Sequence, residues 1–409
     1  MSKRTILHCD MNNFYASVEC MLNPEIKDKF VAVCGSQETR HGIVLAKNDR
    51  AKAMGVKTGE AIWEAKQKCP ELIVVSPHYD EYIRFSKLAQ QIYYRYTDLI
   101  EPYGPDECWL DVTGSRLLFG DGKEIADRIR RDISDELGLT VSVGVSFNKI
   151  FAKLGSDLKK PDATTVISFE NFRAEIFNLP VRDLLGVGGS TAKKLNRYGI
   201  NTIGQLANSS EDFLCRILGK NGLLLHSYAN GLEASPVSLF ETQVPLKSIG
   251  HGITAVRDLK NEDEVWRVFL ELTQEIGHRL RECHNLCSKV SISVRSNDLN
   301  RFSRQCPVTP TQSPMIIAKT ARKLFHDNYT WDIPVRSLSV TAEALLPESA
   351  PVQHDLFCDI AKLQKLNRIE DTVDILRGRF GKDAVKNAVL CTDIALPPHK
   401  TVIMPSGRI

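Results

Sequence analysis

Two acidic positions at the ends of apolar runs constrain this chain more than any other feature. Asp10 ends the run Thr5-Ile-Leu-His-Cys9, and Asp106 with Glu107 opens the alternating run Cys108-Trp-Leu-Asp-Val112. Each run has the length and composition of a β-strand. Carboxylates that converge at strand ends lose hydration and repel one another, so they usually come with a cation. Convergence would predict two Mg²⁺ ions, which steady the attacking and leaving oxygens in phosphoryl or nucleotidyl transfer.

Spacing along the chain does not prove that these acids converge, and a structural alternative stays open. In that alternative, Asp10 caps a helix and Asp106 with Glu107 lies in a polar turn. An acid in an exposed turn keeps its water and needs no cation. The surrounding residues therefore have to decide between the two interpretations.

The composition is that of an ordinary multidomain globular protein. The 409 residues are too many for one compact core and indicate two to four domains. Hydrophobic residues make up 43% and charged residues 25% of the chain. No apolar run approaches the roughly 18 residues of a membrane span. Residues 1–4 lead into a strand-like run without the apolar segment of a secretory signal, so we expect a cytoplasmic protein.

Cysteine usage and net charge narrow the class further. The 11 cysteines are scattered and include no Cys-x-x-Cys pair, which fits reduced thiols better than disulfides. A formal net charge of +3 permits nucleic-acid binding without requiring it. Any such function must therefore be argued from local patches.

Strand-like and helix-like segments alternate from residue 5 to about residue 165, which predicts an α/β or α+β layer fold. The expected elements of this part are 5–10, 13–21, 31–34, 43–46, 81–97, 108–112, 123–137 and 141–145. Short helices broken by glycines follow. A second α+β part is then expected, with helices at 262–281 and 314–326 and strands at 289–295 and 336–342. A last helix is predicted by apolar residues on one side: Ile360, Leu363, Leu366, Ile369, Val373 and Leu376.

Three blocks of sequence carry a resemblance to a known family. In chain order they are Asp10-Met-Asn-Asn-Phe-Tyr-Ala-Ser-Val-Glu19, Pro105-Asp-Glu-Cys-Trp-Leu-Asp-Val-Thr113 and Gly144-Val-Ser-Phe-Asn-Lys-Ile-Phe-Ala-Lys153. They resemble the signature motifs of the Y-family of translesion DNA polymerases, in its polymerase IV group. The match follows the family order over nearly the whole chain, so chance does not explain it.

The resemblance implies a multidomain α+β fold, a right hand with a palm, small inserted fingers, a helical helix-hairpin-helix thumb and an α+β little finger. On this chain the expected domains are the palm at 1–22 and 78–166, the fingers at 23–77, the thumb at 167–232, a linker at 233–240, the little finger at 241–346, and a C-terminal tail at 347–409 with a clamp-binding peptide and a helix.

The resemblance also implies a low-fidelity, template-directed DNA polymerase that adds dNTPs to a primer 3′ end, bypasses damaged template bases and uses two Mg²⁺ ions. In this role Asp10 and Asp106 bridge both ions. Glu107 holds the ion at the primer 3′-hydroxyl, and the Met11 carbonyl completes the ion on the nucleotide side. The ions and nearby cations offset the negative charge of the triphosphate and of the leaving pyrophosphate.

Three more residues are expected to bind the incoming nucleotide. Tyr15 matches the steric gate, an aromatic ring that leaves no room for a ribose 2′-hydroxyl, although without the family context it fits a core tyrosine. Lys160 matches a triphosphate-contacting lysine, and its alternative is a solvated lysine before a proline turn. Lys52 stands where relatives carry an arginine.

The expected fingers depart from the family pattern. Where relatives have Thr-Ala-Asn-Tyr-x-Ala-Arg, this chain has Ala46-Lys-Asn-Asp-Arg-Ala-Lys52. The usual hydroxyls are absent at Ala46 and Asp49, and a lysine supplies charge without a planar two-pronged grip. Lys47 and Arg50 are candidates to compensate, although helix geometry points Arg50 away from the final lysine of the run.

Two basic segments are expected to contact DNA. Gly186 and Gly188 form a glycine turn before Lys193, as in a helix-hairpin-helix whose free N–H groups face a DNA phosphate. In the expected little finger, four basic residues on a half-buried sheet would line the duplex: Lys289, Arg295, Arg301 and Arg304. The alternatives are an ordinary glycine turn and an ordinary solvated sheet face.

The peptide Gln353-His-Asp-Leu-Phe357 resembles the sliding-clamp-binding peptide of bacterial polymerases. Gln353 would bond at the pocket mouth while Leu356 and Phe357 fill an apolar pocket. The alternative is a loop followed by a helix. The partners implied are thus primer-template DNA, dNTPs and the bacterial sliding clamp, and we expect a monomer.

Two other functions compete with the polymerase hypothesis. A catalytically idle paralogue that docks on clamp and DNA would explain the altered fingers but not three mutually repelling acids. A nucleotide cyclase would share a palm and two metal-binding acids, but it has no use for segments that follow DNA.

Overall fold

The computed structural model describes residues 4–36, 40, 42–240, 242, 245–351, 353 and 360–391. These residues fall into two compact units. The first holds those within 1–35 and 43–242, and the second those within 36–42 and 243–400. Across the described residues, every helix is too short or too polar to cross a membrane.

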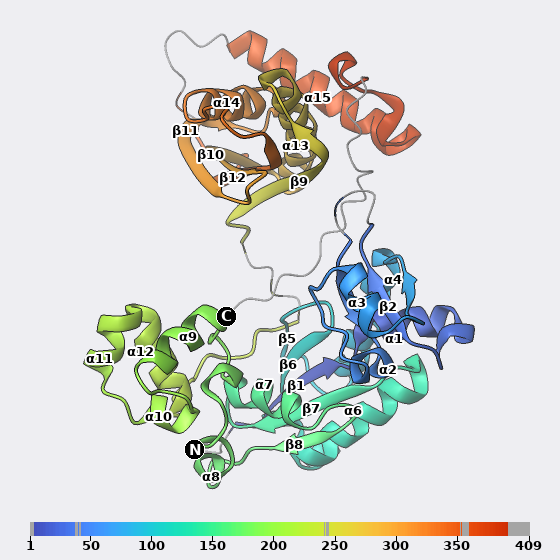
Figure 1. Ribbon diagram of the computed structural model, residues 1–409, viewed down its shortest axis with the longest axis vertical. Helices are drawn as coiled ribbons and strands as arrows, with labels where there is room; N and C mark the ends of the chain where they lie inside the picture. The colour runs from blue at the N-terminus through green and yellow to red at the C-terminus, as the bar shows by residue number, and fades with distance from the viewer. Residues whose placement is uncertain are drawn as a thin grey trace. The chain divides into compact units, whose positions relative to one another are not determined.

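The first unit is built around a five-stranded sheet in the order β5-β6-β1-β7-β8 (Figure 1). Its strands are β1 (Ile6–Met11), β5 (Ile100–Pro102), β6 (Glu107–Asp111), β7 (Val141–Ser146) and β8 (Thr164–Val166). Strand β1 lies at the centre, between β6 and β7, and all six of its residues are buried. Its nearly continuous apolar sequence follows from cover on both faces.

Helices cover both faces of this sheet. On one face, α1 (Phe14–Leu22), α4 (Tyr79–Tyr94) and α6 (Gly122–Leu137) form a core with Leu7, Cys9 and Met11 of β1. On the other face, α7 (Lys149–Leu158) packs against β7 and β1. The approach of α7 requires Gly144, because a Cβ there would clash with the backbone of Ala152. The short helix α5 (Arg116–Phe119) precedes α6.

The turn between β1 and α1 is tight. Asn13 precedes α1 with a φ of 51° and a ψ of 34°, in the left-handed region. Asparagine tolerates this region better than most side chains. The chain therefore passes from a central strand into a helix within two residues.

This unit also contains a smaller sheet, in the order β3-β2-β4. It consists of β2 (Val31–Cys34), β3 (Val44–Lys47) and β4 (Ile73–Val75), with α2 (Asp49–Ala53) and α3 (Ile62–Lys68) beside it. Its core includes Ala32, Val44 and Ile62, all buried.

A group of short helices forms the third part of the first unit (Figure 1). They are α8 (Phe172–Ile176), α9 (Gly189–Arg197), α10 (Ile203–Ala207), α11 (Glu211–Leu218) and α12 (Lys220–Ala229). Leu195, Leu214 and Leu225 lie in their shared core. Gly186 opens the turn before α9 with a φ of +88°, a conformation that favours glycine.

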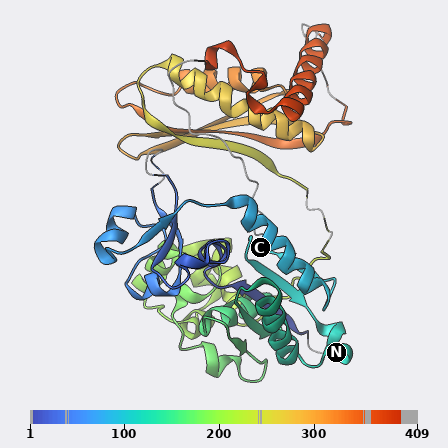
Figure 2. The same cartoon turned by 90° about the vertical axis from the view of Figure 1, so that its right-hand side faces the viewer.

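The second unit is a four-stranded antiparallel sheet with two helices on one face (Figure 2). In the order β11-β10-β12-β9, its strands are β9 (Ser248–Leu259), β10 (Asn285–Ser296), β11 (Arg301–Thr311) and β12 (Val335–Pro347). Helices α13 (Glu262–Glu282) and α14 (Pro314–His326) pack together on the apolar face.

The last long helix, α15 (Ile360–Phe380), attaches to the second unit mainly through polar contacts. The guanidinium of Arg281 lies 2.6 Å from the Asp374 carboxylate and 3.5 Å from that of Glu370. On the predicted apolar side, Ile369 is 49% exposed. The helix was thus predicted correctly, but apolar burial contributes little at that position.

The 3₁₀ helices are η1 (Pro24–Ile26), η2 (Thr113–Ser115), η3 (Val181–Asp183), η4 (Lys382–Ala384) and η5 (Ala388–Leu390).

Candidate active site

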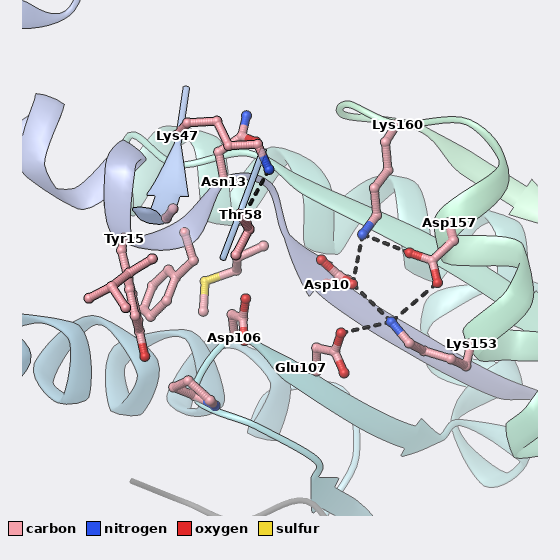
Figure 3. A pocket seen from close by; sticks show the side chains of 15 residues that line it. Asp10, Asn13, Tyr15, Lys47, Thr58, Asp106, Glu107, Lys153, Asp157 and Lys160 are labelled. Atoms are coloured by element: carbon pink, nitrogen blue, oxygen red, sulfur yellow. Dashed lines mark hydrogen bonds and ion pairs between the residues drawn. The ribbon is translucent and has the colours of Figure 1, made fainter. Parts of the chain in front are cut away.

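The antiparallel pairing of β1 and β6 brings the three acids of the sequence motifs together. Asp10 on β1 lies directly opposite Glu107 on β6. The Met11 N–H donates a hydrogen bond of 3.0 Å to the Asp106 carbonyl, which extends the pairing beyond the strand end. Asp10, Asp106 and Glu107 all line one cavity of about 480 Å³ (Figure 3).

Two groups of residues, here called the acidic wall and the β3 wall, make up most of the lining of this cavity. The acidic wall comprises Asp10, Asp106, Glu107, Lys153, Asp157 and Lys160, from β1, β6, α7 and the segment after it. The β3 wall comprises Leu45, Ala46, Lys47 and Thr58. The remaining lining residues are Met11, Asn13, Phe14, Tyr15 and Pro105.

Two ammonium groups offset part of the negative charge of the acidic wall. Lys153 Nζ lies 3.1 Å from the Asp10 carboxylate, 2.7 Å from that of Glu107 and 3.3 Å from that of Asp157. Lys160 Nζ lies 2.8 Å from the carboxylates of both Asp10 and Asp157. Figure 3 shows both lysines pointing into this cluster of acids. Lys153 and Asp157 were not predicted as site residues, although Lys153 ends the third motif block.

Burial and neighbouring charges give the three acids different pKa values. Burial raises the pKa of Asp106 to about 6, with a further contribution from the negative charge of Asp10. Burial likewise raises the pKa of Glu107 to about 7, despite the attraction of Lys153. Burial alone would also raise the pKa of Asp10, but Lys153 and Lys160 together lower it to about 2. Asp10 is therefore the most firmly ionised of the three.

The donor set fits a divalent cation. Carboxylate and backbone carbonyl oxygens are the hard ligands that Mg²⁺ prefers, and the three acids and Met11 supply them. Within the described ranges, no three acid, histidine or cysteine side chains already form a metal-ligand cluster. The Lys153 ammonium instead holds Asp10 and Glu107. These acids thus already lie where positive charge is required.

Tyr15 lines the cavity from the start of α1 and is fixed by other aromatic rings. Its ring stacks on Tyr82 at a centroid distance of 4.1 Å and an interplanar angle of 10°. The Tyr82 hydroxyl donates to the buried Glu19 carboxylate, which also contacts the His78 ring at 3.0 Å. Burial raises the pKa of Tyr15 to about 12, so its hydroxyl stays neutral. The sequence motifs contain Tyr15 but gave no signal for Tyr82.

Of the two lysines in the fingers motif, Lys47 lines the cavity and Lys52 does not. Lys47, at the end of β3, lines the cavity, and its Nζ donates a hydrogen bond of 2.9 Å to the Thr58 hydroxyl (Figure 3). Lys52 is exposed and is not among the lining residues. Arg50 pairs with Asp28 at 3.3 Å on the surface and is not among the residues that line the cavity.

Comparison with known families matches three parts of the chain. Residues 9–157 match the impB/mucB/samB family, and residues 246–356 match the C-terminal domain of that family. Residues 182–233 match the DNA polymerase-iota thumb domain. A DNA polymerase IV of Acetivibrio thermocellus is 51% identical over 396 residues, which cover 96% of this chain and 99% of the relative.

The chain belongs to the DNA polymerase IV family.

A second family member, DNA polymerase IV 2 of Bacillus subtilis, is 39% identical over 401 residues and covers 96% of each chain. Among solved structures, a Y-family DNA polymerase chimera has a TM-score of 0.75 and 25% sequence identity, and covers 84% of this chain and 99% of its own. The predicted fold class, a mixed α+β polymerase with palm, helix-hairpin-helix thumb and little finger, is therefore confirmed.

The part of the chain that matches the DNA polymerase-iota thumb domain, residues 182–233, contains the predicted glycine turn. Gly188 is the N-cap of α9, and a Cβ at Gly188 or Gly189 would meet no atom within 4 Å. Lys193 is exposed on the same helix. Open space at a helix start, with a nearby cation, is what an approaching phosphate requires.

Three of the four basic residues expected to contact DNA share one face of the second unit's sheet. Lys289 and Arg295 alternate with the buried residues of β10, and Arg301 on β11 lies opposite Arg295. Arg304 lies opposite the buried Ile292, on the helix-covered face. It donates a hydrogen bond of 2.9 Å to the Asn328 side chain. Arg304 therefore lies on the opposite face from Arg301, because strand residues separated by an odd number of positions point to opposite faces. Its predicted contact with DNA stays a prediction.

The predicted clamp-binding peptide lies largely outside the described residues. Gln353 is described and exposed. Leu356 and Phe357 fall outside the described ranges.

Proposed function

We propose that this chain is a DNA-directed DNA polymerase that copies damaged templates at low fidelity, by two-metal nucleotidyl transfer from dNTPs to a primer 3′ end. DNA polymerase IV relatives match nearly the full chain, and the polymerase fold matches as well. The observation that carries the proposal is the cavity in which Asp10, Asp106 and Glu107 meet beside the ring of Tyr15.

The acids would hold two divalent cations, for which we propose Mg²⁺. Asp10 and Asp106 would contact both ions, Glu107 the ion on the primer side, and the Met11 carbonyl the ion on the nucleotide side. When bound, the ions lower the pKa of the primer 3′-hydroxyl and offset charge on the leaving pyrophosphate. A site with three acids and two neighbouring lysines provides both the ligands and the compensating charge.

Tyr15 and Lys160 would act on the incoming nucleotide itself. The stacking of Tyr15 on Tyr82 keeps the ring from swinging away, as a steric gate against the ribose 2′-hydroxyl requires. Lys160 lies on the cavity beside Asp10, where its charge can attract a triphosphate. Lys52, exposed outside the cavity lining, has weaker support as a nucleotide contact.

DNA would be bound through its backbone. Gly186, Gly188 and Lys193 would contact phosphates at the start of α9, and Lys289, Arg295 and Arg301 would contact them from the open sheet face. Such contacts hold a duplex without reading its sequence. For the C-terminal peptide we propose sliding-clamp binding through Gln353, Leu356 and Phe357, and for the whole chain a cytoplasmic monomer.

Primer extension tests the proposal directly. The native chain, with Mg²⁺, dNTPs and an undamaged primer-template, should add templated nucleotides, whereas Asp106→Ala should lose at least about 100-fold in rate. Asp135→Ala, an exposed acid on α6, is the matched control and should extend at the native rate. Binding of DNA without extension by the native chain would instead indicate a docking factor.

A second experiment tests the clamp peptide. Replacing Leu356 and Phe357 with alanine should weaken binding to the bacterial clamp about tenfold or more, because such anchors carry most of the energy of a peptide interface. Clamp-free primer extension should stay at the native rate. Unchanged clamp affinity would exclude this peptide as the binding segment.

A further inference from the structure

Lys47 is a cation at the cavity that the acids leave unpaired. The three lysines that line the cavity are Lys47, Lys153 and Lys160. Lys153 and Lys160 are each bound to carboxylates, whereas the hydrogen bond of Lys47 goes to the neutral Thr58 hydroxyl. Among the described residues, no carboxylate lies within ion-pair distance of Lys47 Nζ. An anion that enters the cavity would therefore meet one lysine that has no ion-pair partner among the described residues.

The backbone around Lys47 is held firmly. The next residue, Asn48, accepts hydrogen bonds at its side chain from the N–H groups of Val31 and Ala51, and donates one to the Lys29 carbonyl. These bonds tie the end of β3 to β2 and cap α2 at the same time. The position from which Lys47 reaches the cavity is thus set by three neighbouring segments.

Thr58 is held against the other end of β3. The N–H of Gly59 donates to the Val44 carbonyl at 2.8 Å, and the N–H of Val44 donates to the Glu60 carbonyl at 2.9 Å. The Thr58 hydroxyl therefore faces Lys47 from a loop fixed to the same strand. Because that hydroxyl accepts from Lys47, its own O–H remains available to donate.

The donors of this pair suit a phosphate. An ammonium has three N–H donors, and Thr58 takes one of those of Lys47, so two remain. Burial, with the nearby charge of Lys52, lowers the pKa of Lys47, although the negative charges of Glu60 and Asp49 oppose this shift. A phosphate would give the Lys47 ammonium an ion-pair partner, and the adjacent Thr58 O–H could donate a hydrogen bond to the same phosphate.

We infer that Lys47 and Thr58 bind the triphosphate of the incoming dNTP from the β3 wall, in place of Lys52, to which sequence alignment with the family pattern points. This inference rests on the proposed polymerase function. It assigns to Thr58 the hydroxyl that the fingers sequence lacks at Ala46 and Asp49. It assigns to Lys47 the phosphate contact expected of Lys52, which is not among the residues that line the cavity.

Single-nucleotide insertion on an undamaged primer-template tests the inference. Lys47→Ala should raise the KM for the correct dNTP about tenfold, the usual loss for a hydrogen bond to a charged group. Thr58→Val should raise KM about threefold, as for a neutral bond. Lys52→Ala should raise KM by less than Lys47→Ala does. Lys66→Ala, which removes an exposed lysine on α3, is the matched control and should stay within about twofold of native. Lys47→Arg, which keeps the charge, should recover most of the loss of Lys47→Ala.

Two further measurements separate phosphate contact from a general structural effect. Inhibition by inorganic pyrophosphate should weaken in Lys47→Ala by a factor similar to the rise in KM, because pyrophosphate occupies the same phosphate positions. Affinity for primer-template DNA and the thermal midpoint should match those of the native chain.

The outcomes distinguish this inference from the proposed function. Absence of extension by the native chain would contradict the proposed function. Native activity with an unchanged KM in Lys47→Ala, or with an equal or larger rise in Lys52→Ala, would overturn the inference while the polymerase proposal stands.

Discussion

The two walls of the cavity differ in whether their lysines are paired with carboxylates. On the acidic wall, Lys153 and Lys160 make ion pairs with Asp10, Glu107 and Asp157. On the β3 wall, Lys47 contacts only a hydroxyl in the described structure. Lysines on the first wall therefore already have carboxylate partners within the protein, whereas the lysine on the second has none among the described residues. Equal residue types in one cavity need not have equal roles.

The largest expected difference between the walls is in stability without metal. Lys153→Met leaves buried acids without their counter-ion, which should lower the free energy of unfolding by about 3 kcal/mol. Lys47→Met breaks no ion pair in the described structure and should cost less than about 1 kcal/mol. Urea denaturation in the presence of a chelator measures both. Equal losses would remove the distinction between the walls.

A smaller effect is expected at the aromatic ring beside the two walls. Tyr15→Ala should lower discrimination against ribonucleotides about tenfold or more, because removal of the ring opens space at the sugar. The ratio of kcat/KM for dCTP and CTP opposite a template guanine measures this. Tyr15→Phe keeps the ring and serves as the control. Unchanged sugar selection in Tyr15→Ala would refute the gate and leave the ring with a packing role.

The smallest effect should come from the support of the β3 wall. Asn48→Ala removes the cap of α2 and should lower the free energy of unfolding by about 1 kcal/mol. Because Lys47 is the preceding residue, the KM for dNTP should also rise about twofold to threefold, while kcat stays near native. Denaturation and steady-state insertion assays follow the two effects separately. A fall in kcat without any change in KM would show that the hydrogen bonds of Asn48 position the acidic wall and not Lys47.

The sequence predicted the elements that carry long or buried apolar patterns. The predicted segments 31–34 and 314–326 match β2 (Val31–Cys34) and α14 (Pro314–His326). Strand β5 (Ile100–Pro102) was missed because three residues show no period. Strand β9 (Ser248–Leu259) was missed because its buried positions follow no strict alternation and it contains two glycines.

Site residues divide along a similar line. Asp10, Asp106 and Tyr15 could be named because each lies in a motif block, and the structure places all three on one cavity. Tyr82 and Thr58 could not, because their importance comes from contacts with residues far away in the sequence or outside any motif. Charge type alone did not separate Lys47 from Lys52. Only the fold shows which of the two side chains reaches the cavity.

The left-handed turn at Asn13 has a consequence for how a nucleotide would be checked. Because the strand passes into the helix across this turn, Asp10 at the end of the strand and Tyr15 at the start of the helix belong to one short span of the chain. In the proposed roles, Asp10 would hold the metal ions beside the reacting phosphate, and Tyr15 would contact the sugar. The distance between the metal-binding acid and the aromatic ring is therefore set by one short span of the chain. A nucleotide whose sugar is displaced by the ring would then also have its phosphate displaced from the metal site.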